Sequence, residues 1–167
     1  MKKIVILMLV MVCSSTYAAQ QPVPCSGEEY HQFDFWIGEW EVFDPKGKKV
    51  GENKIEKILN GCVLKESWVS ASPNRGHSFN IYDQTKKQWH QTWVDNGGNL
   101  LQLDGKIHQG SMILKGMTQG QNGQVLNRIT WTPEEENKKK YVRQVWDISH
   151  DNGVTWQTIF DGLYVEK

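Results

Sequence analysis

From Trp40 onward, apolar and polar residues alternate in runs of strand length, and the 3.6-residue period of a helix is almost absent. β-Branched and aromatic residues are enriched in these runs, and clusters of Gly, Pro, Asn and Asp separate them. The pattern predicts strands near residues 39–44, 50–59, 62–69, 76–83, 87–94, 99–106, 111–118, 124–131, 140–148 and 154–165.

The predicted connections are all short, as at Asn60-Gly61, Gln109-Gly110 and Asp151-Asn152-Gly153. Strands joined by such tight turns run antiparallel beside their sequence neighbours. A sheet of about ten strands in one domain curls, and closing it removes both exposed edges. The sequence therefore predicts an all-β fold, an antiparallel up-and-down β-barrel.

The segment 31–44, HQFDFWIGEWEVFD, differs from the strands that follow it. Its aromatic cluster leads into a glycine and then into a β-patterned run. We expect a short N-terminal helical turn that closes one end of the barrel, with Gly38 bending the chain into the first strand and Trp40 filling the floor.

A helical turn followed by Gly38-Glu39-Trp40 resembles the G-x-W opening of lipocalins and the wider calycin group, whose barrels hold a small ligand. The longer segments FDFWIGEWEV, GENKIEKILNGCVLKESW, WHQTWVD and VRQVWDISHDNGVTW resemble a family of exported bacterial proteins of unknown function. This resemblance covers essentially all of the chain after the N-terminal leader. It implies a calycin-like barrel and brings no assigned reaction.

Residues 1–18 have the pattern of a secretory signal peptide. Lys2 and Lys3 precede the apolar run 4–12, and small residues near Ala18 provide a cleavage site. The apolar run is too short to span a bilayer. We therefore expect no membrane span and a periplasmic or secreted protein.

The cysteines agree with export. Cys13 leaves with the signal peptide, and Cys25 and Cys62 remain as a pair in an oxidising compartment. We expect a disulfide that tethers the N-terminal segment 19–30 to a single barrel domain, 31–167. A metal site would need clustered Cys and His residues, and that spacing is absent from the sequence.

Charge argues against a nucleic-acid partner. Without residues 1–18, 17 basic residues face 19 acidic ones, so the net charge is −2. The one basic run, 138–140, follows the acidic run 134–136 and reads as a solvated turn between strands. A basic patch that tracks phosphates is therefore missing.

Residues 149–156, SHDNGVTW, match the S-x-D-x-G-x-T-W pattern called the Asp box, which is familiar from sialidase propellers. We interpret it as a structural turn, in which Ser149 and Asp151 bond turn amides, Gly153 takes a positive φ and Trp156 packs beneath the hairpin. The motif occurs once, and the chain lacks the internal period of about forty residues that a propeller requires.

Tryptophan provides the most informative pattern. Residues two apart on a strand point to the same face, and we expect this face to be the barrel interior. Three strands place a polar residue two positions before a tryptophan: Glu66 and Trp68, Gln91 and Trp93, and Gln144 and Trp146.

Two hypotheses follow from that pattern. The tryptophans fill a core in which the amides bond one another or water. Alternatively, they line a ligand cavity, because a barrel of about ten strands is wider than side chains fill easily. The residues predicted to bind the ligand are Glu66, Trp68, Asn80, Tyr82, Gln91, Trp93, Gln144, Trp146, Phe160 and Tyr164.

The sequence leaves three functions open. The first is binding of a small, partly apolar or aromatic molecule. The second is an enzyme, a lyase, isomerase or hydrolase, with Glu66 as acid/base and Asp95 as a second carboxylate, although no serine elbow, H-E-x-x-H or phosphate loop is present. The third is a structural or interaction module of the cell envelope, which predicts a filled interior and an exposed apolar patch.

Haem deserves separate consideration because some ten-stranded calycin barrels bind it through one histidine. C-x-x-C-H is missing from the sequence, and no histidine falls mid-strand on the predicted interior face. His77 is the nearest candidate, because a one-residue shift in the alternation would turn it inward. We expect no cofactor and no metal.

Overall fold

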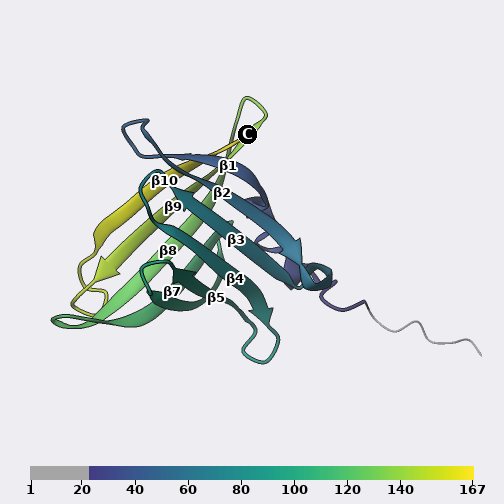
Figure 1. The fold of residues 1–167 in the computed structure, drawn as a ribbon. Helices are drawn as coiled ribbons and strands as arrows, with labels where there is room; N and C mark the ends of the chain where they lie inside the picture. Colours follow the sequence, from purple (N-terminus) through teal and green to yellow (C-terminus); the bar gives the residue numbers. More distant parts are fainter. Residues whose placement is uncertain (1–22) are drawn as a thin grey trace, which may run out of the picture.

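The computed structural model describes residues 23–167, which form a closed barrel of ten antiparallel strands (Figure 1). Each strand pairs with its neighbours in sequence, and β1 pairs with β10 to close the sheet. The predicted up-and-down barrel is therefore confirmed. The strands are β1 (Gly38–Phe43), β2 (Lys49–Ile58), β3 (Val63–Ser70), β4 (Arg75–Asp83), β5 (Gln88–Asp95), β6 (Leu100–His108), β7 (Ser111–Gly120), β8 (Gly123–Glu136), β9 (Lys139–Ser149) and β10 (Gln157–Glu166).

The largest departures from the predicted bounds lie at the end of β8 and the start of β10. The acidic and basic runs that we interpreted as a turn continue the β8–β9 ladder, in which Glu135 pairs with Lys140 and Glu136 with Lys139. Opposite charges across a strand pair favour this extension. Strand β10 begins at Gln157 because the preceding turn holds residues 150–156 out of the sheet.

The expected helical turn consists of two short 3₁₀ turns, η1 (Glu28–His31) and η2 (Asp34–Trp36), at the right-hand end of the barrel in Figure 1. Phe33 and Trp36 are fully buried there, with ring centroids 5.0 Å apart. The indole of Trp40 donates a hydrogen bond to the Trp36 carbonyl at 3.0 Å. Gly38 has a φ of 154°, which L side chains rarely adopt, so it provides the predicted bend.

A disulfide joins Cys25 to Cys62, with 5.2 Å between their Cα atoms. It ties the segment before η1 to η3 (Leu59–Gly61), the turn between β2 and β3, as predicted. The predicted signal peptide, 1–18, lies outside the described residues. Within residues 23–167, no helix has the length and apolar character needed to cross a membrane.

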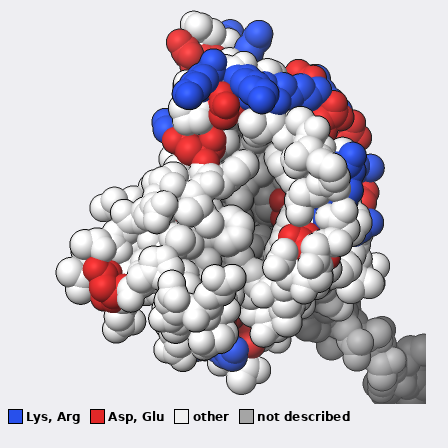
Figure 2. Space-filling view, turned by 60° about the vertical axis from the view of Figure 1, so that its left-hand side comes forward, with Lys and Arg blue, Asp and Glu red and all other residues white. Residues whose placement is uncertain are grey.

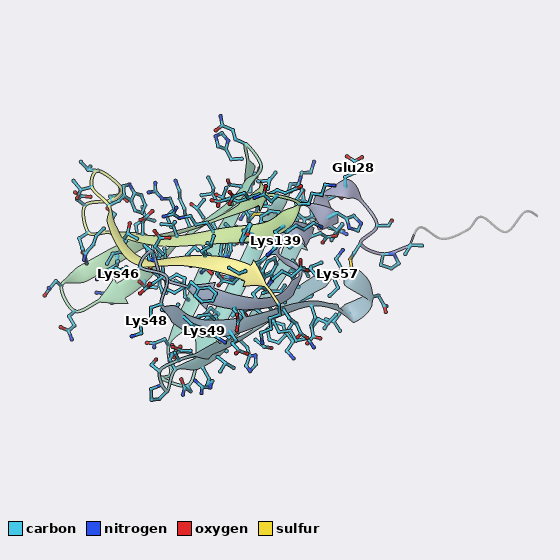
Figure 3. All side chains as sticks on the ribbon, turned by 90° about the horizontal axis from the view of Figure 1, so that it is seen from above. Glu28, Lys46, Lys48, Lys49, Lys57 and Lys139 are labelled. Carbon is cyan, nitrogen blue, oxygen red and sulfur yellow. A yellow bond between two sulfur atoms is a disulfide. The ribbon has the colours of Figure 1, made fainter. Side chains whose placement is uncertain are left out.

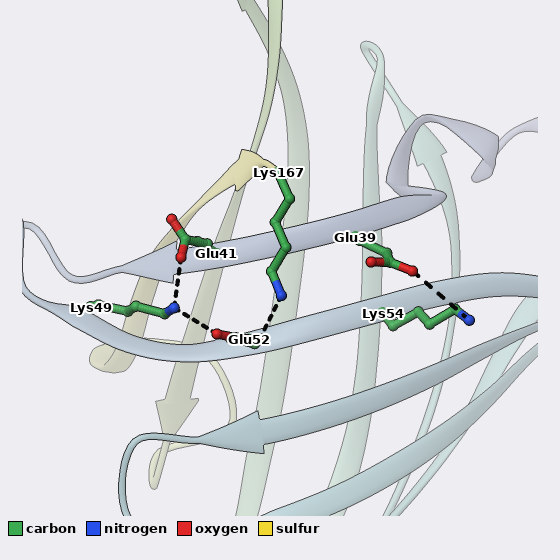
Figure 4. Close-up of polar contacts among 6 residues, drawn as sticks. All are labelled: Glu39, Glu41, Lys49, Glu52, Lys54 and Lys167. Atoms are coloured by element: carbon green, nitrogen blue, oxygen red, sulfur yellow. Dashed lines mark hydrogen bonds and ion pairs between the residues drawn. The ribbon is translucent and has the colours of Figure 1, made fainter.

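Ion pairs cover the outer face where the barrel closes (Figure 4). The Lys49 ammonium group bridges Glu41 and Glu52, at 2.6 Å from each, and Lys167 reaches Glu52 at 2.5 Å. The hydrogen bond from Lys167, followed by that from Lys49, lowers the pKa of Glu52 to about 2. The backbone N–H of Lys167 also bonds the Glu39 carbonyl, so the C-terminus lies beside the start of β1.

Lysines gather on the outside of the molecule. Figure 3 shows Lys46 and Lys48 toward one end of the barrel, and Lys57 with Glu28 near the end that carries the 3₁₀ turns. Lys57 pairs with Asp34 at 2.6 Å.

Candidate functional site: a cavity in the open half of the barrel

The interior of the barrel is filled at one end and hollow at the other. Phe33, Trp36 and Trp89 pack into the end closed by the 3₁₀ turns, and Phe33 meets Trp89 edge to face at 5.6 Å. A cavity of about 480 Å³ occupies the opposite half, and its lining includes residues in or beside the β3–β4 and β5–β6 turns: Ser70, Asn74, Asp95 and Asn99. Figure 2 looks toward this end and shows a hollow bordered mainly by uncharged residues.

Eight of the ten predicted ligand-binding residues line this cavity: Glu66, Trp68, Gln91, Trp93, Gln144, Trp146, Phe160 and Tyr164. The three tryptophans therefore face inward, as the alternation predicts. Several lining residues were missed: Val50, Ser70, Asn74, Asn99, Leu101, Ile129, Trp131 and Ile159. The same alternation identifies Ile129 and Trp131, because both share one face of β8.

Asn80 and Tyr82 do not line the cavity. Asn80 is fully buried beneath its floor, and its amide donates to the Leu64 carbonyl at 3.1 Å. Tyr82 packs at the closed end against Tyr30 and Trp89, with centroids 5.4 and 6.3 Å apart. Both are on the predicted inner face but lie too deep, and within the described chain the cavity lining includes no residue of β4.

Glycines let the aromatic walls lie flat against neighbouring strands. A Cβ at Gly76 would stand 2.3 Å from the Trp93 ring, and one at Gly51 would stand 2.4 Å from the Trp68 ring. Both distances are far below van der Waals contact, so a side chain at either position would displace the indole. These two glycines therefore set the width of the cavity.

We expect Gly76→Ala to move the Trp93 indole away from β4 and into the cavity. The near-UV circular dichroism of the protein should change, because this signal reports how indoles are fixed. His77→Ala, at the next position on the same strand but exposed, is the matched control and should leave the spectrum unchanged. Identical spectra for both variants would contradict the proposed packing.

Glu66 lies at the floor of the cavity, where two side chains donate hydrogen bonds to its carboxylate. The Asn53 amide donates to Oε1 at 2.7 Å, and the Ser78 hydroxyl donates to Oε2 at 2.6 Å. The Asn80 amide donates in turn to the Ser78 oxygen at 2.9 Å, which leaves the Ser78 proton for Glu66. Glu66 therefore acts only as a hydrogen-bond acceptor for these two side chains.

Further polar side chains extend this network across the floor. The Tyr164 hydroxyl donates to Gln144 Oε1 and accepts from the Asn53 amide at 3.2 Å. The Gln91 amide donates to Asn80 Oδ1 at 2.8 Å. The interior amides thus bond one another, as the packed-core hypothesis expects, but they form the floor of an open cavity.

Burial governs the electrostatics of Glu66, which is only 5% exposed. Desolvation raises the pKa of this carboxyl to about 7, although the hydrogen bonds from Ser78 and Asn53 act in the opposite direction. Burial, followed by the charge of Glu66, raises the pKa of Tyr164 well above its ordinary value. The ion pairs within residues 23–167 do not include Glu66.

Asp95, the second candidate carboxylate, lies at the rim. The Asn99 amide donates to both of its oxygens at 3.0 Å, and the Gly97 backbone N–H donates at 2.9 Å. The bond from Asn99 is the main cause of its lowered pKa. Asp95 organises the β5–β6 turn, and the described hydrogen bonds do not join it to Glu66.

The residues around the cavity do not fit haem ligation. His77 lies on the outer face of β4, exposed, and its ring contacts the Ser67 hydroxyl at 3.2 Å. The predicted assignment of inner and outer residues on β4 is therefore correct as it stands. The one-residue shift that would turn His77 inward does not occur. In the described part of the chain, the residues lining the cavity include neither histidine nor cysteine.

The Asp-box segment forms the predicted structural turn between β9 and β10. Asp151 accepts hydrogen bonds from the Thr155 backbone and hydroxyl at 2.8 and 2.6 Å, which lower its pKa to about 2. The Ser149 hydroxyl accepts from the Gly153 N–H at 2.8 Å, and Gly153 has a φ of 92°. Trp156 packs under Arg128, whose guanidinium lies 3.9 Å from the ring centroid.

Fold and cavity together define a closed β-barrel with an aromatic, partly polar interior that opens at one end. A scan against models of known protein families found no match, and a search among curated proteins found no match either. The resemblance to the exported bacterial family therefore stays a prediction.

Proposed function

We propose that this chain is an exported protein that binds one small, partly apolar or aromatic molecule inside its barrel. The observation that supports this most directly is the cavity of about 480 Å³, which is large enough for such a molecule. Aromatic walls with a few polar groups at the floor are typical of small-molecule sites. A structural module would have the filled interior that this barrel lacks at its open end.

Binding would draw on three contributions. Apolar ligand surface removed from water stabilises the complex by about 25 cal/mol per Å². The rings of Trp68, Trp93 and Trp146 provide surfaces for stacking. Glu66 and the two glutamines at the floor orient polar atoms of the ligand.

Export rests on two observations from different parts of the chain. Residues 1–18 read as a signal peptide, and Cys25 and Cys62 form a disulfide, which is typical of proteins outside the reducing cytosol. We infer a periplasmic or secreted protein with a small-molecule ligand and without a nucleic-acid partner.

Intrinsic fluorescence tests the binding proposal, because four tryptophans line the cavity. Titration with a panel of small aromatic and apolar molecules, haem included, should reveal a compound that changes the emission saturably. Trp93→Phe should reduce the change. Trp156→Phe, at the Asp-box turn, is the matched control and should not. If the whole panel leaves the emission unchanged, the proposal is wrong.

A second candidate function is an enzyme that uses Glu66 as acid/base. A carboxyl whose pKa is raised to about 7 at the floor of a cavity is suited to proton transfer near neutral pH. It would act as a lyase, isomerase or hydrolase on the bound molecule. Liquid chromatography coupled to mass spectrometry of a neutral ligand after incubation separates the two functions, because the chromatographic step also resolves an isomer of the same mass. Wild-type protein converts the ligand and Glu66→Gln does not if this is an enzyme, whereas both return it unchanged if the protein only binds.

A further inference from the structure

The charged groups that line the cavity have one sign. Glu66 and Asp95 are the acids, and within the described residues the lining includes no lysine, arginine or histidine. The ion pairs of residues 23–167 lie elsewhere: Arg128 pairs with Asp147 at 2.9 Å, and Arg143 with Asp161 at 2.6 Å. The cavity is therefore acidic, whereas the described cations are paired with other carboxylates or lie outside the lining.

The negative charge of Glu66 is also not offset by its hydrogen bonds. Both donors, the Asn53 amide and the Ser78 hydroxyl, are neutral. The Asn80 bond to Ser78 fixes the direction of that hydroxyl proton toward the carboxylate. A buried carboxylate with neutral partners gains most from a cation that approaches through the open side.

Aromatic rings surround the path to Glu66. Trp68 of β3 and Phe160 of β10 both line the cavity and contact each other edge to face, with centroids 6.2 Å apart. Trp93, Trp131 and Trp146 complete the walls. Aromatic faces attract organic cations, and the attraction is stronger where water is excluded.

We propose that the ligand is an organic cation: a protonated amine or quaternary ammonium group on an aromatic or apolar body. The cationic head lies at Glu66, and the body lies against the tryptophans. Asp95 at the rim adds attraction along the entrance. This inference rests on the proposed binding function and names the chemical class that the cavity selects.

Three probes of one shape test it by isothermal titration calorimetry: phenethylamine, phenethyl alcohol and phenylpropionate, which are cationic, neutral and anionic at about pH 8. We expect the amine to bind at least about tenfold more tightly than the alcohol, and the carboxylate to bind most weakly. Glu66→Gln should lower the affinity for the amine about tenfold or more and change that for the alcohol little. Glu39→Gln, an exposed acid on β1, is the matched control and should change neither.

A second measurement uses wild-type protein alone, so it does not depend on how the variant folds. Affinity for the amine should rise about tenfold from pH 6 to pH 8 as Glu66 loses its proton. Asp95 and Tyr164 are the other titratable groups that line the cavity. A lowered pKa keeps Asp95 ionised and a raised pKa keeps Tyr164 neutral over this range, so neither should contribute.

The outcomes distinguish this inference from the function on which it rests. If the alcohol binds as tightly as the amine, or if the amine affinity is independent of both pH and Glu66, the cation proposal is overturned while binding in the cavity stands. If the three probes and the whole fluorescence panel fail to bind, both proposals are wrong.

Discussion

Replacing Trp36 by alanine should lower the free energy of unfolding by about 3–5 kcal/mol, as measured by urea denaturation. The Trp36 side chain is fully buried at the closed end of the barrel. Its ring stacks on Phe33 and lies 5.3 Å from the Trp131 ring, centroid to centroid. Truncation leaves a void between rings that the strands cannot collapse to fill.

Trp68→Ala is the matched control for that prediction. Trp68 has the same side chain but lines the cavity and is only partly buried, so its removal enlarges an existing space. We expect a loss below about 2 kcal/mol. Equal losses for the two variants would mean that the 3₁₀ turns and their aromatic residues do not anchor the fold.

Glu66→Gln should remove a pH dependence of stability worth about 3 kcal/mol. The folded protein raises the pKa of Glu66 from 4.5 to about 7, so this carboxyl binds its proton more tightly when folded. Its contribution to stability is therefore fully present below about pH 4.5 and is lost as the pH rises to about 7. Relative to wild type, the variant should gain stability over this range, as followed by denaturation at several pH values.

The same series with Asp95→Asn provides a control of opposite sign. Folding lowers the pKa of Asp95, mainly through the bond from Asn99. Its stabilising contribution is present above the unfolded pKa and is lost as the pH falls, so this variant should lose stability relative to wild type as the pH rises. A difference between wild type and Glu66→Gln that does not vary with pH would show that Glu66 is solvated.

The fold could be predicted from the sequence because each strand of this barrel pairs with the strands next to it in the chain. The alternation of apolar and polar residues shows which side chains face the interior, and the short turns show which strands pair. Trp68, Trp93 and Trp146 were placed inside on that basis, and they line the cavity. Alternation does not show how far along the barrel axis an inward-facing residue lies. For example, the inner face of β4 carries Ser78, Asn80 and Tyr82, which lie at successive depths from the cavity floor into the core.

The chemistry of the floor could be predicted only in part. Glu66 was identified because it stands two residues from a tryptophan, but its partners Asn53 and Ser78 come from the two flanking strands. Their positions depend on the register of three strands, which the sequence does not fix. Likewise, the absence of a basic residue from the described lining emerges only when all strands are placed together.

The two ends of the described chain lie away from the opening. Cys25 is bonded to the turn between β2 and β3, and Lys167 is bonded to the start of β1, directly after the 3₁₀ turns. An affinity tag, a fluorescent fusion or a bead linked at either terminus would thus leave the entrance facing the bulk solution. The molecule is suited to immobilisation on a sensor surface without obstructing what enters it.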